Sequence, residues 1–400
     1  MKPASPRPGL TILLLLLAGA FLSAQTSQQT PRTPVGPGLG SWTQFRGDAL
    51  GTGRSLSPEP RYVGVKWKYF TADSVTAGPM VVDGRIIAAT ETGQVHCVDV
   101  KTGKKIWARV VGPGGPGNGF VHGSPRIFNG KIYLGSRRGR FYCVRLADGE
   151  VLWSRELTHA KDRVTFPAPI YASPRGDERG IVVPTMEHAI YCLDPETGKT
   201  RWKVETAREI GSTPVILGNR IFAPSKGRRV YEIDYGTGKV LRKILLPGTT
   251  HCSPAFGLGY LFLTIGGNRA VAVDLAPPAA GQLEMSHIKW NIQSQGEARN
   301  AMAYADGIVY MPDLGDIIAV DANSGKRLWS YTTSYKPCDP CIVGDHLIFA
   351  VRDGFVKALD RRTGKEVWSI KLDYKIYQGP IVVDGVIYVA TMDNYLIAIE

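Results

Sequence analysis

The sequence repeats itself at intervals of about 40 residues, and this periodicity limits the fold more than any other feature. The segment GPMVVDGRII at 78–87 recurs as GPIVVDGVIY at 379–388. Further copies lie between these two and bring the total to eight, although the last two of them are degenerate. They start at Ser124-Pro125, Ser173-Pro174, Thr213-Pro214, Ser253-Pro254, Ala301-Met302 and Asp339-Pro340.

A second signature follows in most copies, an Asp and a Trp eight residues apart with a Gly between them. Asp99, Gly103 and Trp107 show it first. The complete form recurs as Asp194, Gly198 and Trp202, as Asp321, Gly325 and Trp329, and as Asp360, Gly364 and Trp368. Three copies vary: Arg145 replaces the Asp before Trp153, Arg242 replaces the Trp after Asp234, and an insertion at 276–281 separates Asp274 from Trp290.

Each copy has the pattern of four short strands joined by tight turns. In the first copy the first strand ends at Asp83-Gly84, a strong hairpin signal, and the second covers Arg85 to Thr90. The third covers Val95 to Asp99, and the fourth carries the Trp. Four strands per repeat indicate a propeller blade, and no segment shows sustained helical periodicity. We therefore predict an all-β, eight-bladed β-propeller of four-stranded antiparallel blades, whose many turns agree with 46 Gly and 27 Pro.

The eighth copy ends at Glu400 in its third strand, so its fourth strand must come from elsewhere. Arg61 to Phe70, which contains Trp67, fits that place and would close the ring without exposed sheet edges. The signature residues suit their positions in a blade. Gly adopts the positive φ of a turn, Asp caps the turn backbone, and Trp fills the gap between blades while its N–H finds a carbonyl.

The N-terminus has the pattern of a secretory signal peptide. Lys2 and Arg7 precede an apolar run, Leu10 to Leu22, that is too short to span a bilayer. We predict a signal peptide at 1–24, a flexible spacer at 25–41 and a single propeller at 42–400. Export would place the protein in the periplasm or outside the cell, and no Cys follows the apolar run as a lipid attachment site.

The formal net charge is +13, which can attract nucleic acid or anionic lipid. The basic residues are nevertheless scattered, and adjacent arginine pairs occur only at Arg137-Arg138, Arg228-Arg229 and Arg361-Arg362. We therefore expect a basic, soluble surface, no nucleic-acid partner, no transmembrane span and a monomer.

The six cysteines include one close pair, Cys338 and Cys341. Such a pair suits a local disulfide, a redox couple or half of a metal site, but a structural or unpaired role is the more common outcome. No second pair completes a zinc site, and no His follows Cys341 as haem attachment requires.

The repeat resembles that of pyrroloquinoline-quinone-type β-propellers, in which Ala/Val-x-Asp-x-x-Thr-Gly-Lys-x-x-Trp recurs. Two families share such repeats: quinoprotein alcohol dehydrogenases, and BamB, the lipoprotein of the outer-membrane β-barrel assembly machinery. Trp42 to Asp48 (WTQFRGD) also resembles the Trp-x-x-Phe-Arg-Gly leader of exported bacterial BamB-like propellers. The resemblance covers 42–400 and implies the propeller fold, but a fold does not fix a function.

The dehydrogenase resemblance implies a bound quinone with Ca²⁺, a vicinal Cys-Cys pair against the cofactor and a longer chain. This sequence has no Cys-Cys pair, and no acidic cluster stands where a Ca²⁺ cage and a catalytic base are expected. Asp313 and Asp316 occupy the turn between second and third strands. We therefore predict no catalytic residue, no metal site and no cofactor, and keep pyrroloquinoline quinone with Ca²⁺ as the alternative.

The residues just before each innermost strand are predicted to ring one end of the central channel. They offer stacking and charged hydrogen bonds to a planar or anionic ligand, although the mouth of any propeller channel is polar. The candidate ligand-binding residues are His122, Tyr171, His251, Arg299, Asn300, Tyr377 and Gln378. The long links at 112–119 and 158–169 are expected on the same face, as a rim for partners.

These observations favour an exported binding platform, similar to BamB-like proteins, that binds other proteins or peptides of the cell envelope on its loop face. Two alternatives remain open. One is a quinone-dependent dehydrogenase of alcohols or sugars, and the other is a sensor of a small ligand.

Overall fold

The computed structural model describes residue 1 and residues 40–61, 64–112, 123–158, 167–277, 287–294 and 300–400. Apart from Met1, these belong to one compact unit, Pro34–Glu400. The predicted signal peptide, nearly all of the predicted spacer, much of the two long links and most of the insertion at 276–281 lie outside the described residues. Those assignments stay predictions. Among the described residues, no helix has the length and apolar character needed to cross a membrane.

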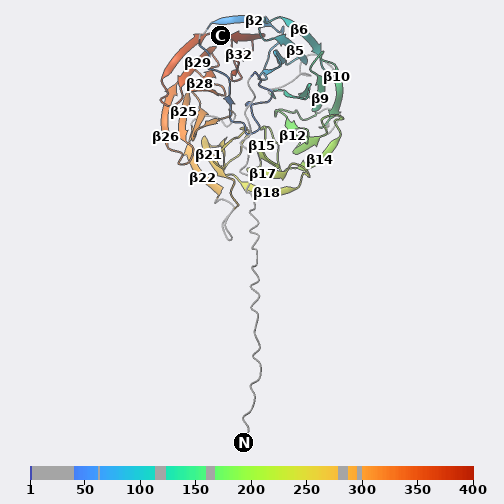
Figure 1. Ribbon diagram of the computed structural model, residues 1–400, viewed down its shortest axis with the longest axis vertical. Coiled ribbons are helices and arrows are strands. Elements are labelled where there is room, and N and C mark those ends of the chain that lie inside the picture. Colours follow the sequence, from blue (N-terminus) through green and yellow to red (C-terminus); the bar gives the residue numbers. More distant parts are fainter. Residues whose placement is uncertain (2–39, 62–63, 113–122, 159–166, 278–286, 295–299) are drawn as a thin grey trace. The chain divides into compact units, whose positions relative to one another are not determined.

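Eight antiparallel sheets surround a central channel, as the repeat predicts (Figure 1). The described residues contain no α-helix. Blade 1 consists of β3 (Met80–Val82), β4 (Arg85–Ala89), β5 (Gln94–Asp99) and β6 (Lys105–Val110), with the short β3 innermost and β6 outermost. These bounds lie within a few residues of the predicted strands.

The following blades repeat this order from the channel outward. Blade 2 contains β7 (Arg126–Phe128), β8 (Lys131–Gly135), β9 (Arg140–Arg145) and β10 (Val151–Glu156); blade 3 contains β11 (Arg175–Asp177), β12 (Gly180–Thr185), β13 (Ala189–Leu193) and β14 (Thr200–Glu205). Blade 4 contains β15 (Val215–Leu217), β16 (Arg220–Ser225), β17 (Arg229–Asp234) and β18 (Val240–Leu245); blade 5 contains β19 (Ala255–Gly257), β20 (Tyr260–Ile265), β21 (Arg269–Asp274) and β22 (Ile288–Gln293). Blade 6 contains β23 (Ala303–Ala305), β24 (Ile308–Pro312), β25 (Asp316–Asp321) and β26 (Arg327–Thr332); blade 7 contains β27 (Cys341–Val343), β28 (His346–Ala350), β29 (Phe355–Asp360) and β30 (Glu366–Lys371).

Blade 8 is completed by both ends of the described chain. It contains β31 (Ile381–Val383), β32 (Val386–Ala390) and β33 (Tyr395–Ile399), and its outer strand is β2 (Val65–Phe70). β2 runs antiparallel to β33 with Trp67 opposite Ala398. The predicted closing strand is therefore confirmed. One further strand, β1 (Arg54–Ser55), lies inside the ring and pairs in parallel with β27.

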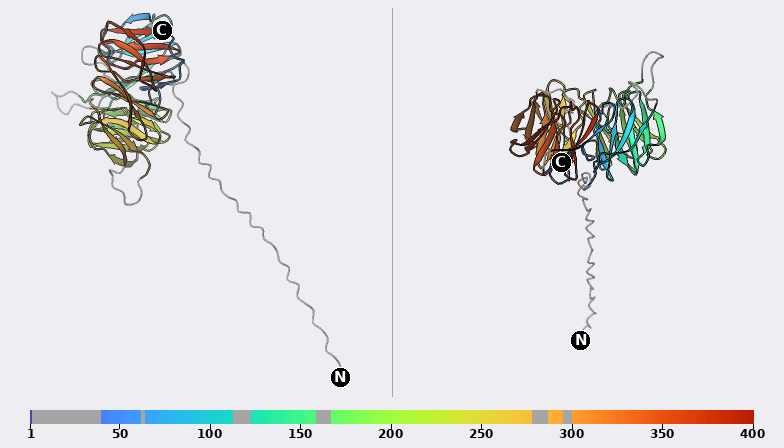
Figure 2. Two further views of the ribbon diagram at one scale, coloured as in Figure 1. Left: turned by 90° about the vertical axis from the view of Figure 1, so that its left-hand side faces the viewer. Right: turned by 90° about the horizontal axis from the view of Figure 1, so that it is seen from above.

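The two ends of the channel differ in what surrounds them. We call one end the hairpin face, because the turns between first and second strands, such as Asp83-Gly84, lie there. The opposite end, the loop face, carries the links that lead from the outer strand of one blade to the inner strand of the next. Figure 2 shows the blades edge-on, with their strands running between these two faces. Asp313 also lies on the loop face, in the turn that was predicted for it.

The repeat Trp joins each blade to the next. The Trp107 indole N–H donates to the carbonyl of Leu146 in blade 2 at 3.1 Å. Its ring lies so close to Gly149 that a Cβ there would come within 2.8 Å of it. The same hydrogen bond joins Trp67 to Val100, Trp153 to Pro195, Trp202 to Tyr235, Trp290 to Ala322 and Trp329 to Arg361.

The two exceptions follow from the same geometry. In blade 4, Arg242 replaces the Trp and still donates to blade 5, from Nη2 to the carbonyl of Leu275 at 2.9 Å. Trp368 of blade 7 faces blade 8. The outer strand of blade 8 is β2, which is distant from β33 in the sequence, so no Asp-Thr-Gly turn joins these two strands. The Trp368 indole N–H accordingly finds no hydrogen-bond partner among the described residues.

The repeat Asp caps the turn that receives this Trp. Asp194 Oδ1 accepts hydrogen bonds from the backbone N–H and the hydroxyl of Thr197 at 2.8 and 2.9 Å. Asp99, Asp234, Asp321 and Asp360 cap their turns in the same way. A hydrogen bond from Arg201, together with these bonds, lowers the pKa of Asp194 to about 2.

Replacing Gly198 by Ala should destabilise the protein more than replacing Gly84 by Ala. Both glycines have positive φ, 67° and 71°, so each variant carries a similar backbone strain of about 1 kcal/mol. Only the methyl group at 198 meets an indole ring, that of Trp153 at 2.6 Å, whereas nothing lies within 4 Å at 84. We expect an additional loss of about 1–3 kcal/mol in the free energy of unfolding, measured with denaturant. Equal losses would contradict the Trp–Gly joint.

Asp194→Asn should flatten the dependence of thermal stability on acid pH. The pKa of Asp194 in the folded protein lies below its ordinary value of 3.8. Its carboxylate therefore stabilises the fold above about pH 4, and this contribution disappears as the pH falls toward 2. Melting temperatures of the two proteins between pH 7 and pH 2 should converge at the acid end. Arg201→Met, which removes the main partner, should reproduce part of the effect, and parallel curves would refute the assignment.

Candidate functional site

Hydroxyl side chains join neighbouring blades at the loop-face end of the channel. Each comes from the residue before the repeat Pro and accepts a hydrogen bond from the equivalent backbone N–H of the preceding blade. Gly78 donates to Ser124, Ser124 to Ser173, Ser173 to Thr213 and Thr213 to Ser253, at 2.8–3.0 Å. In blade 7 the carboxylate of Asp339 replaces the hydroxyl and accepts from Ala301 N–H at 2.9 Å. We call the accepting residues the hydroxyl girdle: Ser124, Ser173, Thr213, Ser253 and Asp339.

The described residues of the predicted mouth lie beside this girdle, and they make different contacts. Asn300 joins blades, because its Nδ2 donates to the Pro337 carbonyl at 2.8 Å. The Tyr377 side chain is 41% exposed, and the guanidinium of Arg352 lies 4.7 Å from its ring centre. His251 lies next to Gly211, and Tyr171 and Gln378 are half-buried. His122 and Arg299 lie outside the described residues, and ligand binding by any of the seven stays a prediction.

Residues 42–55, which we call the leader segment, cross the channel. The leader carbonyls accept hydrogen bonds from the middle residue of successive inner strands. Val81 N–H donates to Trp42, Ile127 to Thr43, Ile216 to Ala49, Phe256 to Leu50, Tyr304 to Thr52 and Ile342 to Gly53, all at 2.8–3.0 Å. The leader thereby contacts the blades in their own order around the ring.

The two remaining inner strands are reached through side chains. In blade 3 the guanidinium of Arg175 donates to the carbonyls of Phe45, at 3.1 Å, and Asp48. In blade 8 the hydroxyl of Ser55 donates to the Val382 carbonyl at 2.7 Å. All eight blades are therefore bonded to the leader segment.

The path of the leader depends on Asp48 and on its glycines. Asp48 Oδ1 accepts from the backbone N–H groups of Leu50 and Thr52 at 2.9 and 3.0 Å, and its Oδ2 accepts from the Thr52 hydroxyl. Gly51 has a φ of 66°, and a Cβ there would lie 2.6 Å from the Pro254 carbonyl oxygen. Only glycine fits this close approach to the ring.

Buried arginines supply positive charge at the same place. Arg175 is fully buried, and burial lowers its pKa to about 10, which still leaves it charged at neutral pH. Arg126 donates from Nε to the Gly176 carbonyl at 2.9 Å and from Nη1 to the Thr43 hydroxyl at 3.0 Å. Burial raises the pKa of Asp48, while hydrogen bonds from Thr52 and the charge of Arg175 oppose that shift.

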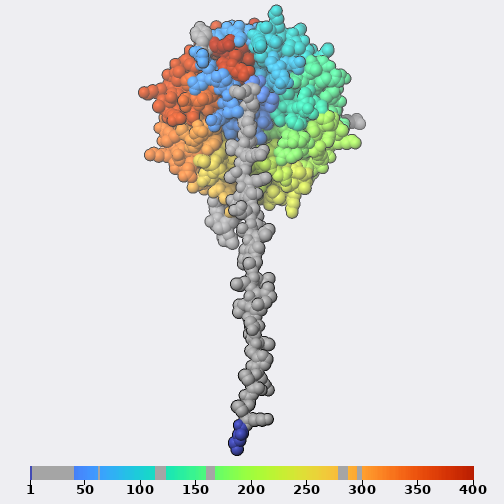
Figure 3. All heavy atoms as spheres, in the orientation of Figure 1, coloured from blue at the N-terminus to red at the C-terminus, as the bar shows by residue number. Residues whose placement is uncertain are grey.

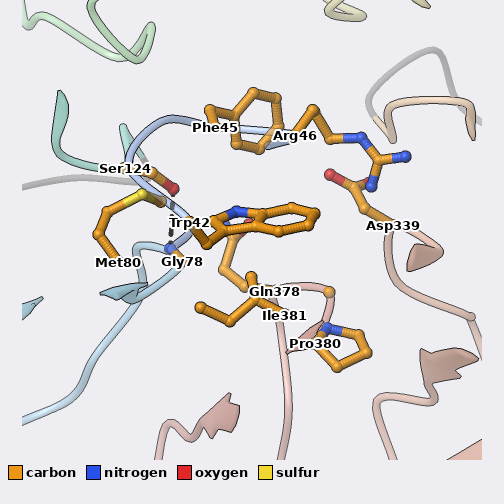
Figure 4. Close-up of a pocket in the computed structure, with 11 residues that line it drawn as sticks. Trp42, Phe45, Arg46, Gly78, Met80, Ser124, Asp339, Gln378, Pro380 and Ile381 are labelled. Carbon is orange, nitrogen blue, oxygen red and sulfur yellow. Dashed lines mark hydrogen bonds between the residues drawn. The ribbon is translucent and has the colours of Figure 1, made fainter. Parts of the chain in front are cut away.

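A small pocket remains on the loop-face side of the leader (Figure 4). Its volume is about 20 Å³, which suits about one water molecule. In Figure 4 the Arg46 guanidinium points toward the Asp339 carboxylate, above the Trp42 ring. The charge of Arg46 lowers the pKa of Asp339, although burial raises it more. Arg46 is itself anchored by a 3.0 Å hydrogen bond to the Met302 carbonyl.

The pocket against the leader is too small for a quinone with its calcium ion. Sites for small molecules typically measure about 300–1,000 Å³, far more than the pocket against the leader. The described residues also contain no group of three or more His, Cys, Asp or Glu side chains arranged to hold a metal ion. We therefore derive no redox step for this chain, and cofactor binding stays a prediction.

All six cysteines are buried free thiols. Cys338 and Cys341 therefore do not form the local disulfide that their spacing suggested. Cys338 Sγ instead contacts the Ile376 carbonyl at 3.6 Å, and Cys341 begins β27. Burial raises the pKa of both thiols to about 12, so neither is a thiolate at neutral pH, which opposes a redox role.

Sequence reasoning did not find the leader as an element of the channel. It identified Trp42 to Asp48 only as a mark of resemblance. The available signal was the spacing of Gly47, Gly51 and Gly53, all of which have positive φ. Three glycines within seven residues indicate a chain that turns repeatedly and packs closely against neighbouring backbone or side chains.

One protein-family model matches most of the chain. Its description is outer membrane protein assembly factor BamB, and it matches residues 64–167, 163–337 and 315–400. The leader segment lies outside the match. A comparison with curated protein sequences returned no match.

Several solved structures share the fold. BamB from Moraxella catarrhalis superposes with a TM-score of 0.68 at 16% identity, covering 85% of this chain and 98% of that one. Quinohemoprotein alcohol dehydrogenase from Comamonas testosteroni gives 0.73 at 15% identity, covering 90% and 80%. The computationally designed Ika8 protein gives 0.66 at 14% identity, covering 82% and 97%. At such identities the similarity shows the fold alone.

Arg175→Met should destabilise the protein far more than Arg179→Met. The first change leaves the carbonyls of Phe45 and Asp48 without their buried donor and removes the charge near the Asp48 carboxylate. We expect a loss of about 3–5 kcal/mol in the free energy of unfolding. Arg179 also pairs with a carboxylate, that of Asp177, but it is 41% exposed, so its loss should cost less than about 1 kcal/mol. Denaturant titrations compare the two, and similar values would contradict the anchoring role of Arg175.

Proposed function

The chain belongs to the family of outer membrane protein assembly factor BamB, and from this we propose that it is an exported platform that binds other proteins of the cell envelope. The proposal rests on one observation, an exposed cluster of aromatic side chains on the loop face. The channel itself offers a large partner little room, because the leader segment crosses it. Binding would therefore use the surface around the mouth.

The cluster lies over blades 7 and 8, and we call it the aromatic patch: Tyr335, Arg352 and Tyr377. The side chains of Tyr335 and Tyr377 are 58% and 41% exposed. Arg352 stacks on Tyr377, and its backbone N–H donates to the carbonyl of Lys336, the residue after Tyr335, at 3.0 Å. Tyr and Arg are the residues that most often carry binding energy in protein interfaces.

A second group of rings extends the patch toward the outside of blade 8. Tyr374 lies 4.9 Å from Tyr395, and Phe70, which is 57% exposed, lies 5.3 Å from Tyr395, each distance joining ring centres. Lys68 Nζ lies 5.0 Å from the Tyr374 ring centre. Rigid aromatic side chains with nearby cations suit a partner segment that offers apolar and acidic groups.

Photo-crosslinking in the cells that naturally make this protein tests the platform. A benzophenone amino acid replaces Tyr335 or Tyr377 in two variants, and Glu178 on the hairpin face in a control. We expect protein adducts from positions 335 and 377 and none from 178. Tyr377→Ala should reduce adducts from position 335 about tenfold, which corresponds to the loss of one strong interface contact. Adducts from 178 alone, or none from either patch position, would refute the proposal.

The dehydrogenase alternative is tested on the purified protein. Pyrroloquinoline quinone and Ca²⁺ are added, and absorbance and the alcohol- or sugar-dependent reduction of a dye are followed. We expect neither stoichiometric quinone binding nor turnover. Turnover would overturn the platform as the main function.

A further inference from the structure

The leader segment behaves as a bound peptide, and we propose that the central channel is a peptide-binding site. Its ligand is a segment of the pattern Trp-x-x-Phe-Arg-Gly-Asp-x-x-Gly-x-Gly, which in this chain is residues 42–53. The chain supplies its own ligand, and the site is distinct from the aromatic patch on the loop face. The inference does not depend on the proposed platform function.

The ring binds the leader chiefly through the leader backbone. Apart from β27, which pairs with β1 of the leader, each innermost strand is the edge of its sheet, so the N–H groups on its channel side have no strand partner in the blade. Six of these donors, from Val81, Ile127, Ile216, Phe256, Tyr304 and Ile342, pair with leader carbonyls. Recognition of main-chain groups by an unpaired strand edge is how proteins capture extended peptides. Here eight short edges arranged in a circle replace one long edge.

Selectivity comes from the positions where the leader backbone approaches the ring most closely. At Gly51 a Cβ would lie 2.6 Å from the backbone oxygen of Pro254 and 3.3 Å from Arg175 Nη2. At Gly47 it would lie 3.0 Å from the Trp42 ring. A side chain at Gly51 therefore meets backbone that cannot move aside, and a peptide with Ala at this position fits poorly.

Hydrogen bonds within the leader also stabilise the conformation in which it is bound. Asp48 holds Leu50 and Thr52 through three hydrogen bonds, and all of these lie within the leader. A ligand that is already folded loses less conformational entropy when it binds. The Asp48 carbonyl then accepts from Arg175, so the turn that Asp48 stabilises is the one that the ring recognises.

The eight blades do not need the leader for their strands. Every strand of the eight four-stranded sheets lies between Val65 and Ile399, and β1 within the leader is a fifth strand added to blade 7. Figure 3 shows blue atoms, which belong to early residues of the chain, at the centre of the ring. The residues between the leader and β2 connect this ligand covalently to the ring.

Cutting that connection in the folded protein tests the proposal. A protease recognition sequence is inserted between Arg61 and Tyr62, the purified chain is cleaved, and the products pass through size-exclusion chromatography in native buffer. We expect the N-terminal fragment to elute with the ring and to separate only in denaturant. Its release under native conditions from a ring that stays folded would overturn the proposal.

Exchange measures the specificity. The cleaved protein is separated from its own N-terminal fragment in denaturant, the ring is refolded with a fluorescent synthetic peptide of residues 40–61, and the anisotropy of the peptide is followed while unlabelled peptides compete. We expect the Gly51→Ala peptide to compete at least about tenfold less well than the natural sequence. A Leu56→Ala peptide, changed at a side chain that is 41% exposed, should compete as the natural one does. Equal competition by the Gly51→Ala peptide or a scrambled peptide would refute the site.

If the ring unfolds after cleavage, the proposal is tested by hydrogen exchange in the intact chain instead. In the Gly51→Ala protein, hydrogen exchange should be faster at the backbone amides of Phe256 and Tyr304, which the leader pairs, than in the natural chain. The amides of the middle strands, such as those of Leu263 and Val271, should keep their protection. Unchanged exchange at Phe256 and Tyr304 would show that the leader does not bind through these groups.

Discussion

The rest of the structure depends on the innermost strand of each blade, which is a sheet edge turned toward the channel. Its N–H groups have no strand partner on that side, and an unpaired buried donor costs as much free energy as a lost hydrogen bond. The leader carbonyls pair six of these donors. A segment that satisfies donors on all sides of a ring must change direction repeatedly, so it carries glycine at 47, 51 and 53. The channel shape and the leader sequence therefore constrain each other.

Two sets of joints hold neighbouring blades together, one on each face of the ring. The Trp side chains bond to the next blade beside the Asp-Thr-Gly turns, and the hydroxyl girdle joins the blades on the loop face. The outer strands need a different protection, because each is a free edge that another chain could pair with. Cations such as Lys66, Lys68, Arg201 and Lys203 lie on these edges and make such pairing unfavourable. Part of the +13 net charge therefore has a structural explanation.

The blades could be predicted because their physics recurs. Asp194, Gly198 and Trp202 repeat a pattern seen in other copies, and the segment with Trp67 was placed in blade 8 because the fourth strand of that blade was missing. The leader was not predicted, because it occurs once and most of its partners are backbone groups, so only the spacing of its glycines marks it in the sequence. Asp339 shows the same limit. The sequence marked it only as the start of a degenerate copy, whereas its carboxylate replaces a hydroxyl of the girdle.

The pairing of β2 with β33 has a consequence for how the protein is made. A chain that emerges from a ribosome or a translocation pore with its N-terminus first presents β2 almost a full chain length before β33. Until then, β2 has no strand to pair with, and the first blade lacks blade 8 on one side. Contacts between such distant segments form late and leave the unfinished chain open to proteolysis. The ring therefore closes only when synthesis and transport of the chain have reached β33.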